Sequence, residues 1–224
     1  MYKMVLCALL GICLSAFWCP QAEAMVVISE IYYDHPGDDE GHEFVELYNN
    51  SDEVVDLTHW EIQWAGNEFA QRGVEISGTI APHGYFLIGG DFTLADFGVE
   101  PDMIYNFDFQ NGGSATDGIR LYDGIEYYDT ILYDSPNANT LPGDLGWGGA
   151  TFAPDVTQGH SLAREKVFRD TDEMNDFIEL TTPQPDNSSV QKPKGSAQIP
   201  ENATVISLAG GMAGMNLVHK LWRF

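Results

Sequence analysis

Cysteine is almost missing from this chain. The three cysteines, Cys7, Cys13 and Cys19, all lie within the first 24 residues. The sequence after residue 24 contains no thiol, which excludes disulfide bridges, thiol catalysis and zinc–thiolate sites from that part. The whole chain is 44% hydrophobic and 12% aromatic. We therefore expect a packed globular core rather than disorder.

Lysine and arginine are scarce where acidic residues are abundant. Only Glu23 and Glu201 among the 34 acidic residues lie outside residues 25–190, and this range holds five of the ten lysines and arginines. The range therefore carries a net charge of −27. Because nucleic-acid affinity depends mainly on neutralising phosphates with lysine and arginine, nucleic acid is not an expected partner. Divalent cations, or simply solubility outside the cell, suit this charge better.

The motifs of common hydrolases and nucleotide-binding enzymes are missing as well. The sequence has no Gly-x-Ser-x-Gly, no glycine-rich phosphate loop and no His-Glu-x-x-His. Ser161 follows His160, but neighbours in sequence do not make a catalytic triad. Glu43 and Glu46 are three residues apart on one expected strand, so they point to opposite faces and cannot act as a pair. We expect Glu46 to be buried and bonded to loop amides, and we predict that the protein is not an enzyme.

What the sequence does contain is a series of short strands separated by turns. Val45 and Leu47 share one face of an expected strand, and Trp60, Ile62 and Trp64 share one face of another. This period of two is typical of half-buried strands. The expected strands cover residues 26–34, 43–50, 54–64, 74–80, 85–90, 118–134 (two or three strands with a turn at Asp123-Gly124) and 176–180. Many short strands at this spacing predict an all-β sandwich.

The order of these segments resembles a known family. The segments read VVISEIYYD (26–34), HEFVELYNNSDEVVDLTHWEI (42–62), APHGYFLIGG (81–90), GIRLYDGIEYYDTILYD (118–134) and GHSLAREKVFRDTDEMNDFIELTTPQPDN (159–187). Together they are similar to lamin-tail domains of the bacterial secreted type. The resemblance implies one immunoglobulin-like β-sandwich over residues 25–187 with an accessory or adhesive role. The family usually has glycine where His59 stands; if that position needs a positive φ, the histidine adopts it at some cost.

The amino-terminal segment, residues 1–24, reads as an export signal. It has a basic Lys3, an apolar stretch from residue 5 to about 18, and the small-residue pattern Ala22-Glu23-Ala24. The alternative is an amino-terminal membrane anchor, for which the apolar run is short. We therefore expect an exported protein that works outside the cell or at the cell surface.

The carboxyl-terminal end resembles a PEP-CTERM sorting signal. After a polar linker at 188–198, the tail at 199–224 begins with Pro200, Glu201 and Asn202, where asparagine replaces the second proline of the motif. An apolar segment and two basic residues follow. The resemblance implies an exosortase-type enzyme that acts near Pro200-Glu201, with transient membrane contact. The alternatives are a permanent anchor or an amphipathic helix.

The acidic stretch DHPGDDEGHE at 34–43 offers the clearest metal ligands. Calcium prefers six to eight oxygen ligands, which loops crowded with carboxylates can supply. The candidate calcium ligands are Asp34, Asp38, Asp39, Glu40 and Glu43, while His35 and His42 could serve a softer metal such as zinc. The spacing matches no named calcium loop, so the alternative is a solvated acidic turn.

Two further segments leave alternatives open. Residues 161–170 fit either a short strand or a helical turn. Residues 170–176 begin like a calcium loop, but Met174 stands at a ligand position, which favours a tight turn capped by side-chain oxygens before Phe177.

The aromatic residues bear on what the protein binds. Five of them could stack on sugar rings, although we expect most to fill the core: Tyr32, Tyr33, Tyr127, Tyr128 and Trp147. The sequence thus favours an exported, non-enzymatic binding or scaffolding module whose partner is a polysaccharide or a surface protein. The alternatives are a metal-dependent hydrolase and a calcium-stabilised adhesion module, both using the loop at 34–43.

Overall fold

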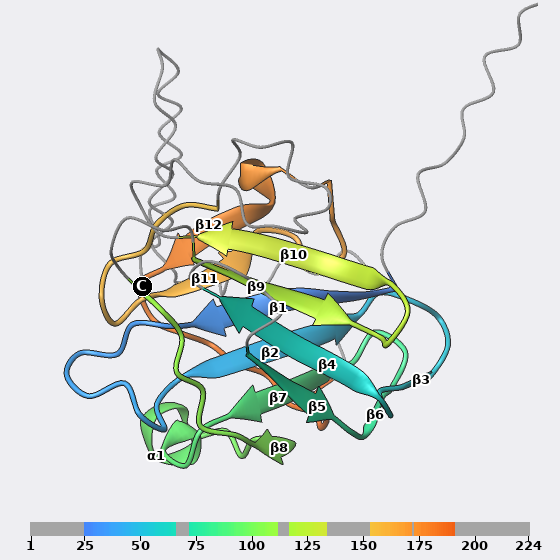
Figure 1. Cartoon of the computed structure of the whole chain (residues 1–224), viewed down its shortest axis with the longest axis horizontal. Helices are drawn as coiled ribbons and strands as arrows, with labels where there is room; N and C mark the ends of the chain where they lie inside the picture. Colours follow the sequence, from blue (N-terminus) through green and yellow to red (C-terminus); the bar gives the residue numbers. More distant parts are fainter. Residues whose placement is uncertain (1–24, 66–71, 112–116, 134–152, 172, 191–224) are drawn as a thin grey trace, which may run out of the picture.

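Two stacked β-sheets make up most of the protein. The computed structural model describes residues 25–65, 72–111, 117–133, 153–171 and 173–190 (Figure 1). Helix is confined in these ranges to α1 (Thr93–Phe97) and a single 3₁₀ turn, η2 (Met174–Asp176). The prediction of an all-β sandwich is confirmed.

The larger sheet has six strands. In spatial order they are β12 (Phe177–Leu180), β11 (Ser161–Arg164), β1 (Val26–Tyr32), β2 (Phe44–Asn49), β7 (Tyr85–Gly89) and β8 (Met103–Ile104). All neighbours are antiparallel except β7 and β8, which are parallel. The two longest strands, β1 and β2, form the centre, and the loop that joins them leaves the sheet at one end.

The smaller sheet has four strands and lies across the larger one in Figure 1. Its strands are β10 (Tyr127–Tyr133), β9 (Asp117–Tyr122), β4 (Trp60–Ala65) and β5 (Gly73–Ile76), with a separate pair of β3 (Val55–Asp56) and β6 (Thr79–Ile80). The predicted turn between β9 and β10 is present, since the Asp123 carboxylate accepts the backbone N–H groups of Ile125 and Glu126. Gly124 in this turn has a φ of 93°.

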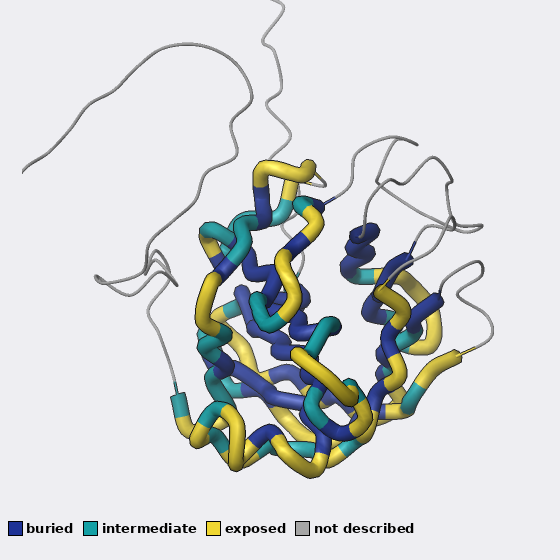
Figure 2. Tube along the Cα trace, turned by 90° about the vertical axis from the view of Figure 1, so that its left-hand side faces the viewer, coloured by how far each residue is buried: buried dark blue, intermediate teal, exposed yellow. Residues whose placement is uncertain are grey.

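The main core lies between the two sheets. Val45 and Leu47 from β2 belong to the same buried cluster as Trp60, Ile62 and Trp64 from β4. This confirms the faces predicted from the period-two pattern. The buried residues run through the interior in Figure 2, while exposed residues mark the loops around it.

The segment after β12 covers the outer face of the larger sheet. We call residues 181–190 the carboxyl-terminal strap. The Asp186 N–H donates to Glu46 Oε2 (2.5 Å), and the Gln184 N–H donates to Glu30 Oε1 (3.0 Å). Glu30 and Glu46 are cross-strand partners on β1 and β2, and burial together with this like charge raises the pKa of Glu46. Glu46 is buried, as predicted, and the Asp186 N–H is a loop amide that bonds to it.

The strap continues to the end of the described chain. Ser188 donates its N–H to Asp102 Oδ2 (2.9 Å), and Val190 packs against the buried cluster of Val27, Tyr48 and Tyr85. The first residues of the predicted linker at 188–198 therefore contact the sandwich.

A buried arginine joins the edge of the larger sheet to the turn before β12. Arg164 is fully buried, and its guanidinium lies 2.6 Å from Asp129 and 3.3 Å from Asp170. It also lies over the ring of Phe177, 4.6 Å from the ring centre. Asp176 accepts the backbone N–H of Thr171 (2.6 Å), so its carboxylate caps the turn, as predicted for residues 170–176.

Several elements differ from the sequence expectation. The segment 74–80 forms two strands because Gly78 breaks it at a φ of 142°, where an added Cβ would lie 2.6 Å from the Phe86 ring. Residues 91–117, which carry no clear pattern, contain α1 and β8. Residues 161–164 form a strand, which decides between the two alternatives. His59 has a φ of 72°, the positive value that glycine would adopt without strain.

Candidate functional site

The loop between β1 and β2, residues 33–43, is held tightly at its second half. We call it the acidic loop. The Gly41 carbonyl accepts the Phe92 N–H (2.9 Å), and the Glu43 carbonyl accepts the Gly90 N–H (3.1 Å). A Cβ on Gly90 would lie 2.2 Å from the Gly41 oxygen, so only glycine permits this approach. The loop is thereby fixed against the turn that leads into α1.

The predicted calcium ligands in this loop have other partners. Asp39 Oδ1 accepts the His35 N–H (2.8 Å), Asp38 Oδ1 accepts the Glu40 N–H (3.3 Å), and Asp34 Oδ1 accepts the Gln158 side-chain amide (3.0 Å). Partial burial raises the pKa of Asp39. These carboxylates shape the loop in the way that Asx turns do. The calcium site stays a prediction.

Glu43 stands apart because it is fully buried. Its Oε2 accepts the Phe109 N–H (3.1 Å), while its Oε1 has no hydrogen-bond partner among the residues that the structure describes. Burial, with smaller contributions from Asp39 and Asp108, raises the pKa of Glu43 to about 8. The side chain is thus mainly uncharged at neutral pH, and an uncharged carboxyl is a poor calcium ligand.

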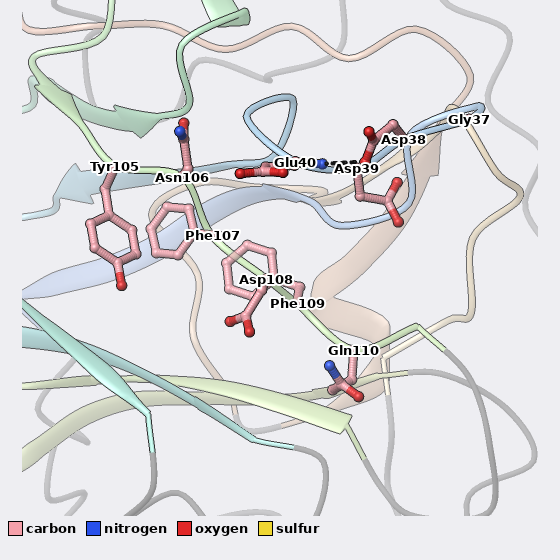
Figure 3. A pocket seen from close by; sticks show the side chains of 10 residues that line it. All are labelled: Gly37, Asp38, Asp39, Glu40, Tyr105, Asn106, Phe107, Asp108, Phe109 and Gln110. Atoms are coloured by element: carbon pink, nitrogen blue, oxygen red, sulfur yellow. Dashed lines mark hydrogen bonds between the residues drawn. The ribbon is translucent and has the colours of Figure 1, made fainter.

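A cleft of about 670 Å³ lies between the acidic loop and the segment that follows β8. It is lined by Gly37 to Glu40 on one side and by Tyr105 to Gln110 on the other (Figure 3). Phe107 and Phe109 are buried and stack on each other, with ring centres 4.6 Å apart, so they anchor the second wall to the core. The side chains that remain available at the rim are carboxylates and amides, together with the half-buried ring of Tyr105.

Asp108 connects this cleft to the smaller sheet. Its Oδ1 accepts the Trp64 indole N–H (2.9 Å), and its Oδ2 pairs with Arg72 (2.9 Å). Trp64 in turn packs edge-on against Phe107 and Phe109. The wall of the cleft is therefore braced by Trp64 of the smaller sheet and by Arg72, which directly precedes β5.

A second group of side chains lies at the outer end of the acidic loop. Among the described residues, His35, His42 and Asp96 form a group of three potential metal ligands. One ligand atom of each lies within 4.8 Å of those of the other two. None of the five predicted calcium ligands belongs to this group. The sequence places His35 and His42 near each other, but it does not indicate Asp96, which comes from α1.

Other predicted site residues fall as follows. Tyr32 and Tyr33 are buried, as expected for core aromatics, while Tyr127 is exposed on one side. Trp147 lies outside the described residues. Ser161 is fully buried and donates to Glu30 Oε1 (2.5 Å), so it is bonded to a carboxylate rather than to a histidine.

The second wall of the cleft is the part that sequence reasoning missed. It lies about 70 residues from the acidic loop, and no local pattern links the two segments. The alternation of Tyr105, Phe107 and Phe109 was the available signal, because aromatic residues at every second position indicate an extended segment with one buried face.

The two stacked β-sheets and the buried interface between them define an immunoglobulin-like β-sandwich domain. The sequence model of the Lamin Tail Domain family matches residues 20–135, more than half of the chain, and the protein belongs to this family.

A comparison with solved structures gives a further similarity. The crystal structure of a DUF4876 family protein from Bacteroides thetaiotaomicron VPI-5482 is similar with 15% sequence identity and a TM-score of 0.47. The similarity covers 80% of this chain and 75% of that chain. No curated protein matches the chain. Within the described residues, no helix has the length and apolar character needed to cross a membrane.

Proposed function

We propose that this protein is an exported, non-enzymatic module that binds a neutral polysaccharide at the cell surface or in an extracellular matrix. The observation that carries this proposal is the cleft between the acidic loop and Tyr105 to Gln110. Its rim presents carboxylates and amides next to the half-buried ring of Tyr105.

The chemistry of the rim favours sugar hydroxyl groups. Carboxylates such as Asp38, Glu40 and Asp108 accept hydrogen bonds, and the amides of Asn106 and Gln110 both accept and donate. A saccharide offers many hydroxyl donors at the spacing of neighbouring carboxylates, and its apolar ring face can pack on an aromatic side chain. Polysaccharides that carry uronic acid or sulfate would be repelled by the same carboxylates.

The geometry of the acidic loop supports a non-enzymatic role. A metal-dependent hydrolase would need carboxylates that converge on an ion and keep an open coordination position. The three carboxylates nearest that description, Asp34, Asp38 and Asp39, bond instead to amide groups of the protein. We therefore propose binding without turnover for this loop.

Binding can be measured by affinity electrophoresis of the full chain in gels that contain either a neutral glucan or a uronic-acid polymer. We expect retardation in the neutral gel alone.

Because one lost hydrogen bond is worth about 1 kcal/mol, Glu40→Ala and Gln110→Ala should each weaken binding about fivefold. Glu126→Ala removes an exposed carboxylate on the β9–β10 turn, which lies on the opposite side of the sandwich from the acidic loop in Figure 1, and should leave binding unchanged. Equal retardation of the Glu40 and Glu126 variants would contradict the proposal, and capture only by a surface protein would name the other class of partner.

We further propose that the tail is a sorting address that an exosortase-type enzyme removes. The tail at 199–224 lies outside the described residues, so the support comes from its sequence: Pro200-Glu201, an apolar segment and a basic end. We expect the intact mass of protein recovered from its own cells to end near Pro200-Glu201 and to occur in the medium or surface fraction. A mass that includes Phe224, found in the membrane fraction, would make the tail a permanent anchor.

A further inference from the structure

Two tyrosines lie side by side on the outer face of the smaller sheet. Tyr122 on β9 and Tyr127 on β10 are cross-strand partners, with ring centres 4.9 Å apart and ring planes tilted by 33°. Tyr127 is 37% exposed, and Tyr122 is half-buried. In Figure 1 the smaller sheet lies in front of the larger one, so this face is turned toward the viewer. The pair is an accessible aromatic surface that does not line the cleft.

An arginine supports one of these two rings. The Arg120 guanidinium lies over the Tyr127 ring, 3.9 Å from the ring centre, and Arg120 itself is only 5% exposed. Because this contact covers one face of the ring, the exposed area of Tyr127 belongs to the other face and to the edges. A cation on an aromatic face is an attractive contact that holds the ring in position. The ring is therefore ordered before a ligand binds, which lowers the entropy lost on binding.

Polar side chains continue the surface across the neighbouring strands. Arg120 Nε donates to Gln63 Oε1 (2.8 Å), and Gln63 Nε2 donates to Glu61 Oε2 (2.6 Å). Glu61 is the cross-strand partner of Tyr122 on one side and of Glu75 on the other. Side chains that are directly opposite each other share one face of a sheet. Two tyrosine rings and two carboxylates thus form one row across all four strands. We call this row, together with Gln63, the tyrosine face.

The composition of the tyrosine face indicates what it can bind. Carboxylates are depleted from the centres of protein interfaces, so a row in which Glu61 and Glu75 flank the aromatic rings is a poor match for a protein partner. The same carboxylates repel acidic polymers. A neutral polysaccharide offers apolar ring faces to tyrosine and hydroxyl donors to carboxylates, each of which can accept more than one hydrogen bond.

The shape of the tyrosine face distinguishes it from the cleft. Its side chains come from successive strands of one sheet, and Gly73, opposite Gln63 on β5, adds no side chain. Concave sites enclose a single small ligand or chain. A row along the surface of a sheet instead suits a ligand that is itself flat, such as polysaccharide chains packed side by side.

We propose that the tyrosine face binds the flat surface of an insoluble neutral polysaccharide. Tyr122 and Tyr127 pack on the sugar rings, and Glu61 and Glu75 accept hydrogen bonds from sugar hydroxyl groups. This surface is separate from the cleft and does not rest on the function proposed for it. Two binding surfaces on one domain would hold the protein in a polysaccharide matrix more firmly than either surface alone.

The test is sedimentation of the full chain with microcrystalline cellulose and with chitin, two insoluble neutral polymers. Bound protein is measured as the loss from the supernatant, and we expect wild type to bind at least one of the two polymers. Tyr127→Ala should weaken this binding about tenfold, because it removes the apolar contact that the ring makes with sugar. Tyr127→Phe keeps the ring and should bind within about twofold of wild type.

The control is Leu94→Ala, which removes an apolar side chain of α1 that is 50% exposed. Its binding should equal that of wild type, so it detects adsorption through exposed apolar surface in general. If Tyr127→Ala does not fold, as judged by its melting transition, Tyr122→Ala takes its place. Failure of wild type to bind either polymer, or equal binding by wild type and the folded alanine variant, would overturn the proposal. Retardation by soluble glucan depends on the cleft and is measured separately, so the two proposals can fail independently.

Discussion

Replacement of Arg164 by methionine is expected to lower the free energy of unfolding by about 3–5 kcal/mol. The guanidinium is fully buried and lies 2.6 Å from Asp129 and 3.3 Å from Asp170. Methionine has a similar volume but leaves the buried Asp129 carboxylate without its cation. An isolated buried charge is far less favourable than the pair, so the loss comes mainly from the partner that remains. Urea denaturation of the full chain, monitored by tryptophan fluorescence, measures this change in the free energy of unfolding.

The matched control for Arg164→Met is Arg72→Met. Arg72 also pairs with an aspartate, Asp108 (2.9 Å), but both side chains are substantially exposed. Because exposed ion pairs contribute little, this variant should change the free energy of unfolding by less than about 1 kcal/mol. The double variant Arg164→Met, Asp129→Asn should regain part of the loss, since no unpaired charge is then left at Asp129. Equal effects at Arg164 and Arg72 would contradict a structural role for the buried network.

The second large effect concerns Glu43 and pH. Its pKa is about 8 in the folded protein, against 4.5 for an ordinary glutamate. A raised pKa means that the folded state binds the proton more tightly than the unfolded state. The contribution to stability is therefore complete below pH 4.5 and is lost as pH rises towards 8, at up to about 1.4 kcal/mol per pH unit. Glu43→Gln removes this ionisation and should be more stable than wild type by about 3–5 kcal/mol at pH 8.

The difference in the free energy of unfolding between Glu43→Gln and wild type should become small at low pH. At pH 4.5 the protonated acid and the amide both keep an acceptor for the Phe109 N–H, and both place a donor group at the other position, one O–H in the acid and an NH₂ in the amide, so the two proteins should differ by much less than at pH 8. Unfolding is measured in buffer that contains EDTA, which keeps metal binding out of the comparison. Glu75→Gln, at an exposed position on β5, supplies the control and should follow wild type at every pH. A constant difference between Glu43→Gln and wild type across the range would show that ionisation of Glu43 is not the cause.

The fold could be predicted from sequence because its signals are local. Alternation at Val45 and Leu47, and at Trp60, Ile62 and Trp64, identifies the faces of β2 and β4 without knowledge of their partners. The ends of the strands were predicted less accurately. The sequence of residues 74–80 predicts one strand, whereas the structure has a break at Gly78. This break depends on a contact with Phe86 from another strand, which the local sequence does not show.

The candidate sites depend on contacts between distant segments, which the sequence does not encode locally. The acidic loop was recognised from its composition, yet its second wall, Tyr105 to Gln110, was not. Asp96 belongs to a short helix without a clear periodic pattern, so nothing in the sequence connects it to His42. Composition thus identifies groups that could bind a ligand, whereas the set that converges is decided by the packing of the loops.

The carboxyl-terminal strap gives the domain a defined response to mechanical tension. Force applied beyond Val190 would first load the packing of Val190 on the outer face of the larger sheet. It would then load the backbone N–H bonds of Ser188, Asp186 and Gln184 to the carboxylates that hold the strap. Because these bonds follow one another along the strap, they would break in sequence, and the sheet itself would be loaded only after they have failed. We therefore expect the strap, about ten residues long, to extend before the two-sheet core and the cleft are loaded.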